Sequence, residues 1–420
     1  TELEINQRAL VVGAGISGMA AALSLSDQGY GVCLVEREPF LGGQGSLLFR
    51  TWKGEDVQMN LSEMTDRVQS DPNIDLRLNT ELAGVEGFVG NFKSTLLSDG
   101  REEPVEHGVA VIATGAFEGR PHEYLYGEDD RVVTHLELDQ RFIRDDPALK
   151  EMKSAVFIQC VGSREPDRPY CSRVCCSHAM ESALHLKKLN PQMRVVVLYR
   201  DIRTYGEREY LYREARMAGV LFIPYTVDRK PQVFTHAGDL KIQVVDPLLE
   251  KDVAMTADLV CLASAIVPYG DEALAQMFKV PMNADGFFVE AHAKLGPSEF
   301  ATDGVFLCGM NHYPKPIDES IAQALAAASR AVTLLARQTV RMSGTVALTD
   351  PGQCSSCGVC LAICPYSAPA VLEKGPFAGR IEINPALCKG CGLCVASCRS
   401  GALNLKGFGE NQIMAMINEI

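Results

Sequence analysis

Two runs of cysteines near the C-terminus constrain the fold of this chain more than any other feature. Both have the spacing C-x-x-C-x-x-C-x-x-x-C, and their members are Cys354, Cys357, Cys360, Cys364, Cys388, Cys391, Cys394 and Cys398. This spacing is typical of a small domain in which eight thiolates hold two [4Fe–4S] clusters. Short spacings let three neighbouring thiolates converge on one cube, and sulfur ligands suit iron.

In such domains the fourth cysteine of each run binds the other cluster. The first cluster would take Cys354, Cys357, Cys360 and Cys398, and the second would take Cys388, Cys391, Cys394 and Cys364. A zinc site would use one C-x-x-C pair from each of two hairpins and would leave thiolates over. A disulfide framework is disfavoured, because cysteines this close rarely bridge and no secretory signal is present. The sequence therefore predicts an α+β ferredoxin domain that moves electrons.

Composition places the chain among ordinary folded proteins and excludes two classes of partner. Its 420 residues suffice for two or three domains, and 47% of them are hydrophobic and 22% charged. A net charge of −13 opposes binding to nucleic acid. No apolar stretch reaches about 18 residues, so we expect membrane association only through a partner. Fifteen cysteines in a chain without a targeting peptide predict a reducing, anaerobic or oxygen-protected cytoplasm.

A second motif lies near the N-terminus, where an apolar strand leads into Gly13-x-Gly15-x-x-Gly18. An Ala-rich helix and a second strand that ends in Glu36 follow, which is the context this fingerprint requires. Gly13 permits the tight turn, Gly15 lets a pyrophosphate approach the backbone, and Gly18 lets the helix pack against the strand. The helix N-terminus offers free N–H groups to the phosphates, and Glu36 is placed to bind ribose hydroxyls. The pattern predicts a Rossmann-type dinucleotide site.

Three further segments favour FAD as the dinucleotide. Residues 41–43 resemble the loop that covers the pyrophosphate in two-dinucleotide flavoproteins, and residues 109–115 and 302–309 resemble their Ala-Thr-Gly strand and closing strand. In this chain Met310 and Asn311 follow Gly309, where those flavoproteins usually have an acidic residue. A helix from about Ile317 would aim its positive N-terminal end at the flavin pyrimidine. The candidate FAD-binding residues are Gly13, Gly15, Gly18, Glu36, Arg37, Gly43, Thr114, Gly115, Gly309, Lys315 and Gln323.

The middle of the chain carries cysteines where a second nucleotide loop is expected. Residues 154–200 have the outline of a second βαβ unit, with a helix predicted at 179–189. Between its first strand and its helix stand Cys160, Cys171, Cys175 and Cys176 in place of glycines. The sequence allows three interpretations of these four residues: buried structural cysteines, a redox-active disulfide, or the ligands of a third [4Fe–4S] cluster. Adjacent cysteines bridge only with strain, and no C-x-x-C is present, so the sequence favours the third cluster.

The middle segment resembles the A-type subunit of heterodisulfide reductase. The resemblance lies in Cys-Val-Gly-Ser-Arg at 160–164 and in Pro-Tyr-Cys-Ser-Arg-Val-Cys-Cys at 169–176. Residues 309–323 and the tandem cysteine runs resemble the same family, so the resemblance covers nearly the whole chain. It implies an α/β, thioredoxin-reductase-like two-dinucleotide-binding flavoprotein core with FAD. It also implies a cluster on the four middle cysteines close to the flavin, and a ferredoxin that carries electrons to other subunits of a redox complex.

Compared with the long methanogen members of this family, we expect this chain to be a short form, without their extra N-terminal cluster domain and inserted ferredoxin. Bifurcating relatives carry a lysine five residues after the second adjacent cysteine, where this chain has Glu181. A lysine would stabilise an anionic reduced flavin, whereas a glutamate would oppose it.

The sequence thus predicts an FAD and iron–sulfur electron-transfer subunit of a multi-subunit oxidoreductase, with no side chain assigned as catalytic. One alternative is a non-bifurcating quinone-interacting oxidoreductase subunit of a sulfate-reduction pathway. Another is an NAD(P)H-dependent flavin oxidoreductase, like the small subunit of glutamate synthase, but it would need the missing glycine loop. A purely structural scaffold would have no use for the FAD fingerprint.

These motifs divide the chain into domains. An FAD-binding domain in two parts, 1–145 and 285–345, is interrupted by a degenerate NAD-type βαβ domain at 146–284. A polar linker at 343–352 leads into the bis-[4Fe–4S] ferredoxin domain and its tail at 346–420. The tail has apolar side chains on one helical face, so it either docks a partner or folds back on the ferredoxin. These side chains are Ile413, Met414, Met416 and Ile417.

Overall fold

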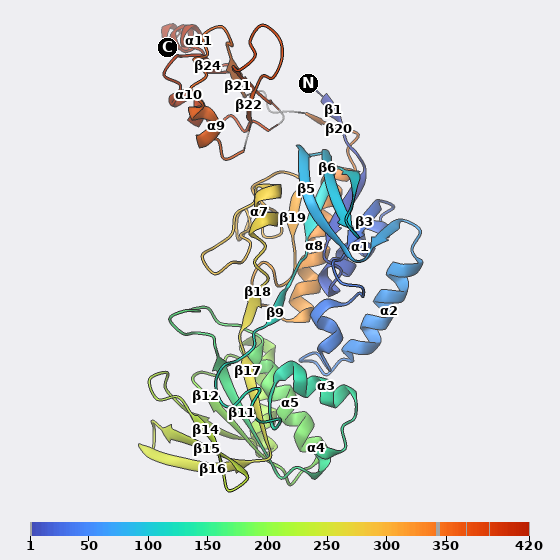
Figure 1. Ribbon diagram of the computed structural model, residues 1–420, viewed down its shortest axis with the longest axis vertical. Helices are drawn as coiled ribbons and strands as arrows, with labels where there is room; N and C mark the ends of the chain where they lie inside the picture. Colours follow the sequence, from blue (N-terminus) through green and yellow to red (C-terminus); the bar gives the residue numbers. More distant parts are fainter. Residues whose placement is uncertain (1, 342–344, 367, 386, 420) are drawn as a thin grey trace.

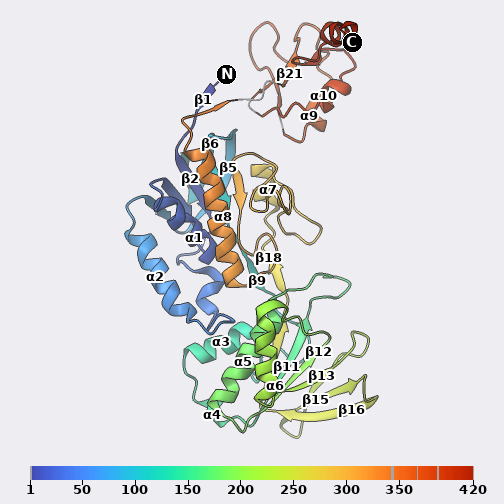
Figure 2. The same ribbon diagram turned by 180° about the vertical axis from the view of Figure 1, so that it is seen from behind.

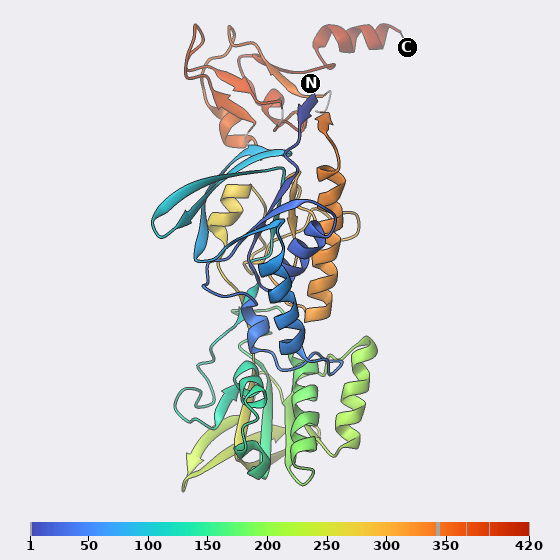
Figure 3. The ribbon, with the colours of Figure 1, turned by 90° about the vertical axis from the view of Figure 1, so that its right-hand side faces the viewer.

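The computed structural model describes residues 2–341, 345–366, 368–385 and 387–419, so part of the predicted linker, residues 343–344, lies outside the described residues. Three parts follow one another along the longest axis of the molecule, as Figure 1 shows. The FAD-binding fingerprint lies in the middle part, the residues around the central cysteines lie at one end, and the C-terminal region lies at the other (Figures 1 and 3).

The middle part is built on a parallel five-stranded sheet in the order β19-β8-β2-β3-β4. Its strands are β2 (Arg8–Val12), β3 (Gly31–Val35), β4 (Ile74–Arg77), β8 (Val109–Ile112) and β19 (Val305–Leu307). Most of their residues are apolar and buried, because layers cover both faces of the sheet. On one face pack α1 (Ile16–Ser26), α2 (Val57–Ser70) and α8 (Ile317–Leu335), and α1 lies beside α8 in Figure 2.

An antiparallel sheet and a short helix cover the other face. They are β5 (Thr80–Phe88), β6 (Asn91–Ser98), β7 (Arg101–His107) and α7 (Glu272–Phe278). Their apolar side chains, which include Phe92 and Phe278, pack on the parallel strands. A small pair, β1 (Glu2–Glu4) with β20 (Thr339–Arg341), joins the two ends of this part.

The second part repeats the same three-layer plan. Its parallel sheet has the order β10-β17-β11-β12-β13, with strands β10 (Val132–Thr134), β11 (Ser154–Val161), β12 (Arg194–Tyr199), β13 (Leu221–Pro224) and β17 (Leu259–Ser264). One face carries α3 (His135–Ile143), α4 (Ala148–Glu151), α5 (Cys175–Leu189) and α6 (Glu209–Met217). The other carries β14 (Gln232–His236), β15 (Asp239–Asp246) and β16 (Lys251–Ala257).

The predicted domain boundaries were 145/146 and 284/285, and the sheets divide the chain at other positions. β10 and α3 belong to the second part, because β10 pairs with β17, and α7 belongs to the first. The chain crosses between the parts in the antiparallel pair β9 (Ala116–Glu118) and β18 (Ile266–Pro268). Strands of three residues give no sequence pattern long enough to mark such a crossing.

The C-terminal region consists of two strand pairs and two short helices around the cysteine runs. They are β21 (Ala347–Thr349) with β24 (Leu403–Leu405), β22 (Pro369–Val371) with β23 (Ile381–Ile383), α9 (Val359–Ile363) and α10 (Leu393–Ala396). Strand β21 lies within the predicted linker, so that prediction was wrong for those residues. Lys389 of this region forms an ion pair with Asp303 of the middle part.

The tail forms helix α11 (Glu410–Asn418), as predicted, and Figure 3 shows it projecting from the C-terminal region. The four apolar side chains of its predicted face are all exposed, with Met416 exposed by 61% and Ile417 by 56%. In the structure, therefore, this face of α11 is not folded back on the ferredoxin domain.

Candidate functional site

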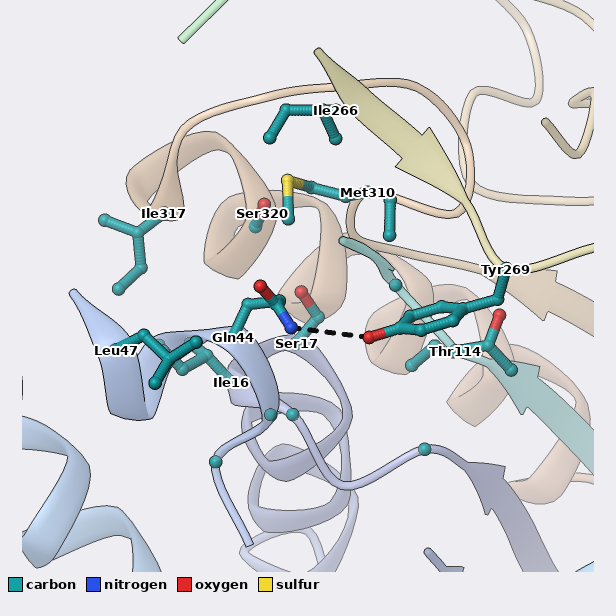
Figure 4. Close-up of a pocket in the computed structure, with 18 of the residues that line it drawn as sticks. Ile16, Ser17, Gln44, Leu47, Thr114, Ile266, Tyr269, Met310, Ile317 and Ser320 are labelled. Carbon is teal, nitrogen blue, oxygen red and sulfur yellow. Dashed lines mark hydrogen bonds between the residues drawn. The ribbon is translucent and has the colours of Figure 1, made fainter. Parts of the chain in front are cut away.

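A cavity of about 820 Å³ lies where the middle part meets the second part. Figure 4 shows part of its wall, where Ile16 and Ser17 of α1 face Ile317 and Ser320 of α8 across the opening. The second part closes the far side with the start of α5 and the end of β17. Eight of the eleven candidate FAD-binding residues line this cavity: Gly13, Gly15, Glu36, Arg37, Gly43, Thr114, Gly115 and Lys315.

The glycine fingerprint has the geometry that a bound pyrophosphate needs. A Cβ added to Gly15 would meet no atom within 4 Å, so the backbone there is open to the cavity. A Cβ at Gly18 would lie 1.8 Å from the Gly13 carbonyl oxygen, because Gly18 packs against the turn and does not line the cavity. Helix α1 begins directly after Gly15 without a side-chain cap, so its first N–H groups are free for a phosphate.

The acidic residue at the end of β3 closes this turn from the other side. The Glu36 carboxylate accepts hydrogen bonds from the backbone N–H groups of Ala14, at 2.6 Å, and Glu38, at 3.0 Å. The guanidinium of neighbouring Arg37 lies 4.3 Å from the centre of the Tyr269 ring. The hydroxyl of Tyr269 accepts a hydrogen bond from Gln44 at 3.4 Å, as Figure 4 shows. This end of the cavity combines an acid, a cation and an aromatic ring, which suits an adenosine.

Two residues of this wall were not among the sequence predictions. Tyr269 and Asp271 enter from the segment after β18 and line the cavity. The Thr114 hydroxyl donates to the Asp271 carboxylate at 2.5 Å, and burial raises the pKa of Asp271. A lone Tyr or Asp in a loop gives no sequence pattern, so only the antiparallel crossing of β9 and β18 brings them to the site.

At the opposite end, the loop before α8 buries a lysine. Lys315 lines the cavity, but its ammonium group donates to the Gly309 carbonyl at 2.8 Å and to the Gln323 side-chain oxygen. Gly309 and Gln323 thus hold Lys315 and do not themselves line the cavity as described. Met310, which stands where an acid is usual, lines the wall in Figure 4.

The second part contributes a polar wall that includes the start of α5. Glu118, His135, His178 and Glu181 all line the cavity. The pKa of Glu118 rises to about 7 because burial disfavours its charged form, and burial also raises that of Glu181. His178 Nε2 lies 3.0 Å from the Asp139 carboxylate, and its ring stacks on that of His135 with centres 4.4 Å apart.

Several buried polar atoms of this wall have no hydrogen-bond partner among the described residues. They are His135 Nε2, Ser177 Oγ and Ser264 Oγ. Buried polar atoms in folded proteins are nearly always paired. The wall therefore fits a ligand that brings its own polar atoms, as a flavin ring does.

The four middle cysteines come together at the start of α5. Helix α5 begins at Cys175, four residues earlier than predicted, so Cys175 and Cys176 occupy its first turn. Cys160 and Cys171 lie close enough to interact electrostatically with Cys175. Three residues between the end of β11 and the start of α5 have a positive φ without being glycine: +61° at Cys160, +58° at Arg164 and +59° at Arg173. Such strained backbone clusters at functional sites.

Positive charge surrounds these thiols. Arg164 donates to the Cys160 sulfur at 3.7 Å, and the backbone N–H of Arg173 donates to the Cys171 sulfur at 3.4 Å. Arg200 and Arg203 also interact with this group. A cluster held by four thiolates is an anion, so guanidinium groups and a helix N-terminus stabilise it.

The middle cysteines connect two cavities. Cys175 lines the large cavity, whereas Cys171 lines a second cavity of about 420 Å³ that opens to the surface. Arg173, Arg203 and Tyr205 also line this outer cavity. A redox centre held by the four thiols would therefore contact the dinucleotide site on one side and an outer cavity on the other.

Some C-terminal cysteines of one run lie near cysteines of the other run. Electrostatic interactions join Cys357 to Cys398, and they join Cys394 to Cys364, Cys388 and Cys391. A small cavity is lined by the second set, namely Cys364, Cys388, Cys391 and Cys394. The backbone N–H groups of Ala347 and Gly390 donate to the Cys388 sulfur at 3.3 and 3.4 Å. Such bonds tune cluster potentials.

Among the described residues, no group of three or more His, Cys, Asp or Glu converges tightly enough for a single metal ion. Thiolates at the corners of an iron–sulfur cube stand further apart than the ligands of one ion. All fifteen cysteines are free thiols, so these groups remain available as ligands.

Family models match two regions of the chain. Residues 9–81 match a model described as FAD dependent oxidoreductase, and residues 353–402 match a 4Fe-4S dicluster domain. The chain is 32% identical to an iron-sulfur A-type subunit of CoB–CoM heterodisulfide reductase from Methanopyrus kandleri, over 89% of this chain and 71% of that protein. It is also 32% identical to the corresponding iron-sulfur subunit of Methanocaldococcus jannaschii, over 100% of this chain and 78% of that protein.

The chain belongs to the A-type subunit family of heterodisulfide reductase. It is an FAD and iron–sulfur electron-transfer subunit of the oxidoreductase class, as the sequence predicted. The family's curated members are subunits of heterodisulfide reductase complexes, which agrees with the expected partners.

Solved structures confirm the predicted flavoprotein fold of this heterodisulfide reductase relative. Thioredoxin reductase of T. acidophilum aligns with a TM-score of 0.55 and 13% identity, over 78% of this chain and 98% of that chain. Thioredoxin reductase of Lactococcus lactis aligns equally well, with 15% identity over 78% of this chain and 99% of that one. In the part of the chain that the structure describes, no helix has the length and apolar character to cross a membrane.

Proposed function

We propose that this chain holds one FAD and three [4Fe–4S] clusters and passes electrons between the flavin and other subunits of a redox complex. One observation carries this proposal: Cys175 of the middle cysteine group lines the same cavity as Gly13 and Gly15 of the fingerprint. A cluster on the middle cysteines would then adjoin the flavin directly. FAD, when bound, supplies the exchange between one-electron and two-electron carriers.

In this proposal the FAD lies along the cavity with its pyrophosphate at Gly15 and the start of α1. Glu36 and Arg37 hold the adenosine end, and Gly43, Thr114 and Gly115 border the middle of the cofactor. The buried ammonium of Lys315 supplies positive charge at the flavin end. Gly309 and Gln323 act through Lys315, since they hold its ammonium group.

The cluster ligands are proposed as follows. The middle cluster takes Cys160, Cys171, Cys175 and Cys176, and the C-terminal clusters take the two crossed sets assigned from the spacing. The electrostatic partners of Cys357 and Cys394 support those crossed sets. The arginines around the middle cysteines support an anionic cluster there, because they would offset its charge.

Glu181 lines the flavin cavity at the position where bifurcating relatives have a lysine. A carboxylate there opposes negative charge on the flavin, and burial already raises its pKa. We therefore propose that this protein relays electrons without splitting pairs between a high-potential and a low-potential path. A quinone-interacting oxidoreductase complex is the alternative setting that fits a non-bifurcating flavin.

The partners would be further iron–sulfur subunits, which exchange electrons with the C-terminal clusters and dock the exposed apolar face of α11. We place the protein in the cytoplasm, because fifteen cysteines without a disulfide fit a reducing compartment. The loop between β11 and α5 contains cysteines and arginines where an NAD(P)H-binding domain needs glycines, so direct reduction by a nicotinamide is not part of the proposal.

An anaerobic reductive titration tests this function. We expect uptake of about five electrons per chain, two by FAD and one by each of three clusters. The Cys175→Ala variant should lose one electron and should leave the other spectra unchanged, whereas Cys33→Ala, which changes a buried core thiol of β3, should lose none. Uptake of four electrons by the wild type would contradict the middle cluster, and absence of bleaching near the flavin bands would contradict the FAD.

A further inference from the structure

A chain of side chains connects the flavin end of the cavity to the protein surface. Lys315 lines the cavity and is 2% exposed. Its ammonium nitrogen lies 3.4 Å from His312 Nδ1, and His312 Nε2 lies 2.7 Å from the Glu290 carboxylate. The side chain of Glu290 is 21% exposed, so the chain of contacts ends in water.

The hydrogen-bond partners fix the tautomer of the imidazole. Gln323 donates its amide N–H to His312 Nδ1 at 2.8 Å, so Nδ1 acts as an acceptor. His312 Nε2 therefore has the hydrogen and donates it to Glu290. Two N–H groups of the charged Lys315 donate to Gly309 O and Gln323 Oε1, and the ammonium also lies 3.4 Å from His312 Nδ1. Because Gln323 already occupies the single lone pair of Nδ1, the contact with Lys315 is a weak, shared one. These contacts fit a protonated lysine and a neutral histidine.

Burial makes this lysine sensitive to nearby charge. Desolvation lowers the pKa of Lys315 to about 7, and the nearby charges that act on it are those of Arg173, Glu319 and Glu290. Burial also lowers the pKa of His312. The charge of Lys315 lowers this pKa further, whereas Glu290 raises it. A negative charge that arrives in the cavity would favour the ammonium form, since opposite charges raise the pKa of a base.

We propose that Lys315 binds a proton from solvent, through Glu290 and His312, when electrons reach the cavity, and releases it by the same path when they leave. This inference rests on the proposed function, because the electrons reside on FAD in that cavity. The proton balances one unit of the added charge, so the lysine couples electron transfer to pH.

The relay conserves atoms at each step. On release, the Gln323 amide turns its N–H away from His312 Nδ1, toward the Pro297 carbonyl that it also contacts at 3.2 Å, and so frees the Nδ1 lone pair. Lys315 then gives a proton to Nδ1 while His312 Nε2 gives its own to the Glu290 carboxylate, which passes it to water. The imidazole ends with its hydrogen on Nδ1, directed at the neutral amine. On uptake each transfer runs backwards, and the two electrons come from a one-electron iron–sulfur carrier in successive steps.

The pH dependence of the flavin midpoint potential in the full-length holoprotein tests the proposal. Above pH 7, where Lys315 is neutral before reduction, one extra proton should accompany each electron pair, which adds about 30 mV per pH unit to the slope. Lys315→Met should lose this contribution, and Lys294→Met, which removes an exposed lysine, should retain it. Below pH 6 the variants should have equal slopes, because Lys315 is already protonated.

Proton uptake, followed with an indicator dye in weak buffer, gives an independent count. Wild type should take up about one proton more per electron pair than Lys315→Met. Glu290→Gln should take up as many protons as wild type, but more slowly. Equal slopes and equal proton counts in all variants would overturn the relay even though FAD is bound. Loss of FAD from the wild type would instead overturn the proposed function, and FAD content is measured in the same samples.

Discussion

Two glycines of the fingerprint should respond to the same substitution in opposite ways. Gly15 has φ −70°, which any residue adopts, and a Cβ there enters empty cavity. Gly18→Ala places its Cβ 1.8 Å from the Gly13 carbonyl oxygen and 2.9 Å from the Gly13 carbonyl carbon, so the backbone must move. Gly15→Ala is therefore expected to affect the ligand and Gly18→Ala the fold.

The expected magnitudes follow from these contacts. A methyl group at Gly15 displaces the pyrophosphate from the N–H groups of α1, and two charge-assisted hydrogen bonds are worth about 3–6 kcal/mol together. The affinity for FAD should fall by about two to four orders of magnitude. The free energy of unfolding without FAD should stay equal or rise by up to about 1 kcal/mol. Gly18→Ala should lower that free energy by at least about 2 kcal/mol.

Titration calorimetry of FAD into flavin-free protein and urea unfolding measure the two quantities. The reasoning would be refuted if Gly15→Ala bound FAD within about threefold of wild type. It would also be refuted if both variants lost the same unfolding free energy, because the open position would then be no different from the packed one.

Further predictions concern the clusters, the flavin and stability. Cys171→Ala should lose about four iron atoms per chain, as one cluster is lost, whereas Cys261→Ala, in the core of β17, should lose none by iron assay. Glu181→Lys should raise the flavin midpoint potential in redox titration, because it replaces a negative charge by a positive one, and Glu181→Gln should raise it less. Burial lowers the pKa of His107 to about 4, so the unfolded state, with a pKa near 6.5, binds the proton more tightly. The free energy of unfolding should thus fall by about 2 kcal/mol from pH 7 to pH 5 through this group, and His107→Gln should remove that fall.

The sequence contained enough to predict the cofactor motifs and the main secondary structure around them. The strand, turn and helix at Gly13–Gly18 are local in the chain, and so is each cysteine run, so their spacing alone predicts a chemistry. The start of α8 at Ile317 also lies where the sequence predicted it. Each of these elements has a pattern that spans one or two turns or a full strand.

The polar wall of the cavity was not predictable in the same way. Glu118, His135 and Asp139 come from a segment that the predicted boundaries assigned to the FAD domain, but β10 and α3 join the second sheet. The approach of His135 and Asp139 to His178 depends on α3 packing beside α5 on the second sheet. No spacing in the sequence records such a contact between distant segments. Lys315 was a candidate for flavin contact, but only the structure reveals that His312 and Glu290 connect it to solvent.

Iron, acid-labile sulfide and FAD per chain, measured on anaerobically purified protein, test the central claim most directly. We predict about 12 iron, about 12 sulfide and one FAD, with four iron and four sulfide lost in Cys175→Ala. About eight of each in the wild type, unchanged by that substitution, would contradict a cluster at the middle cysteines and with it the direct path from flavin to cluster.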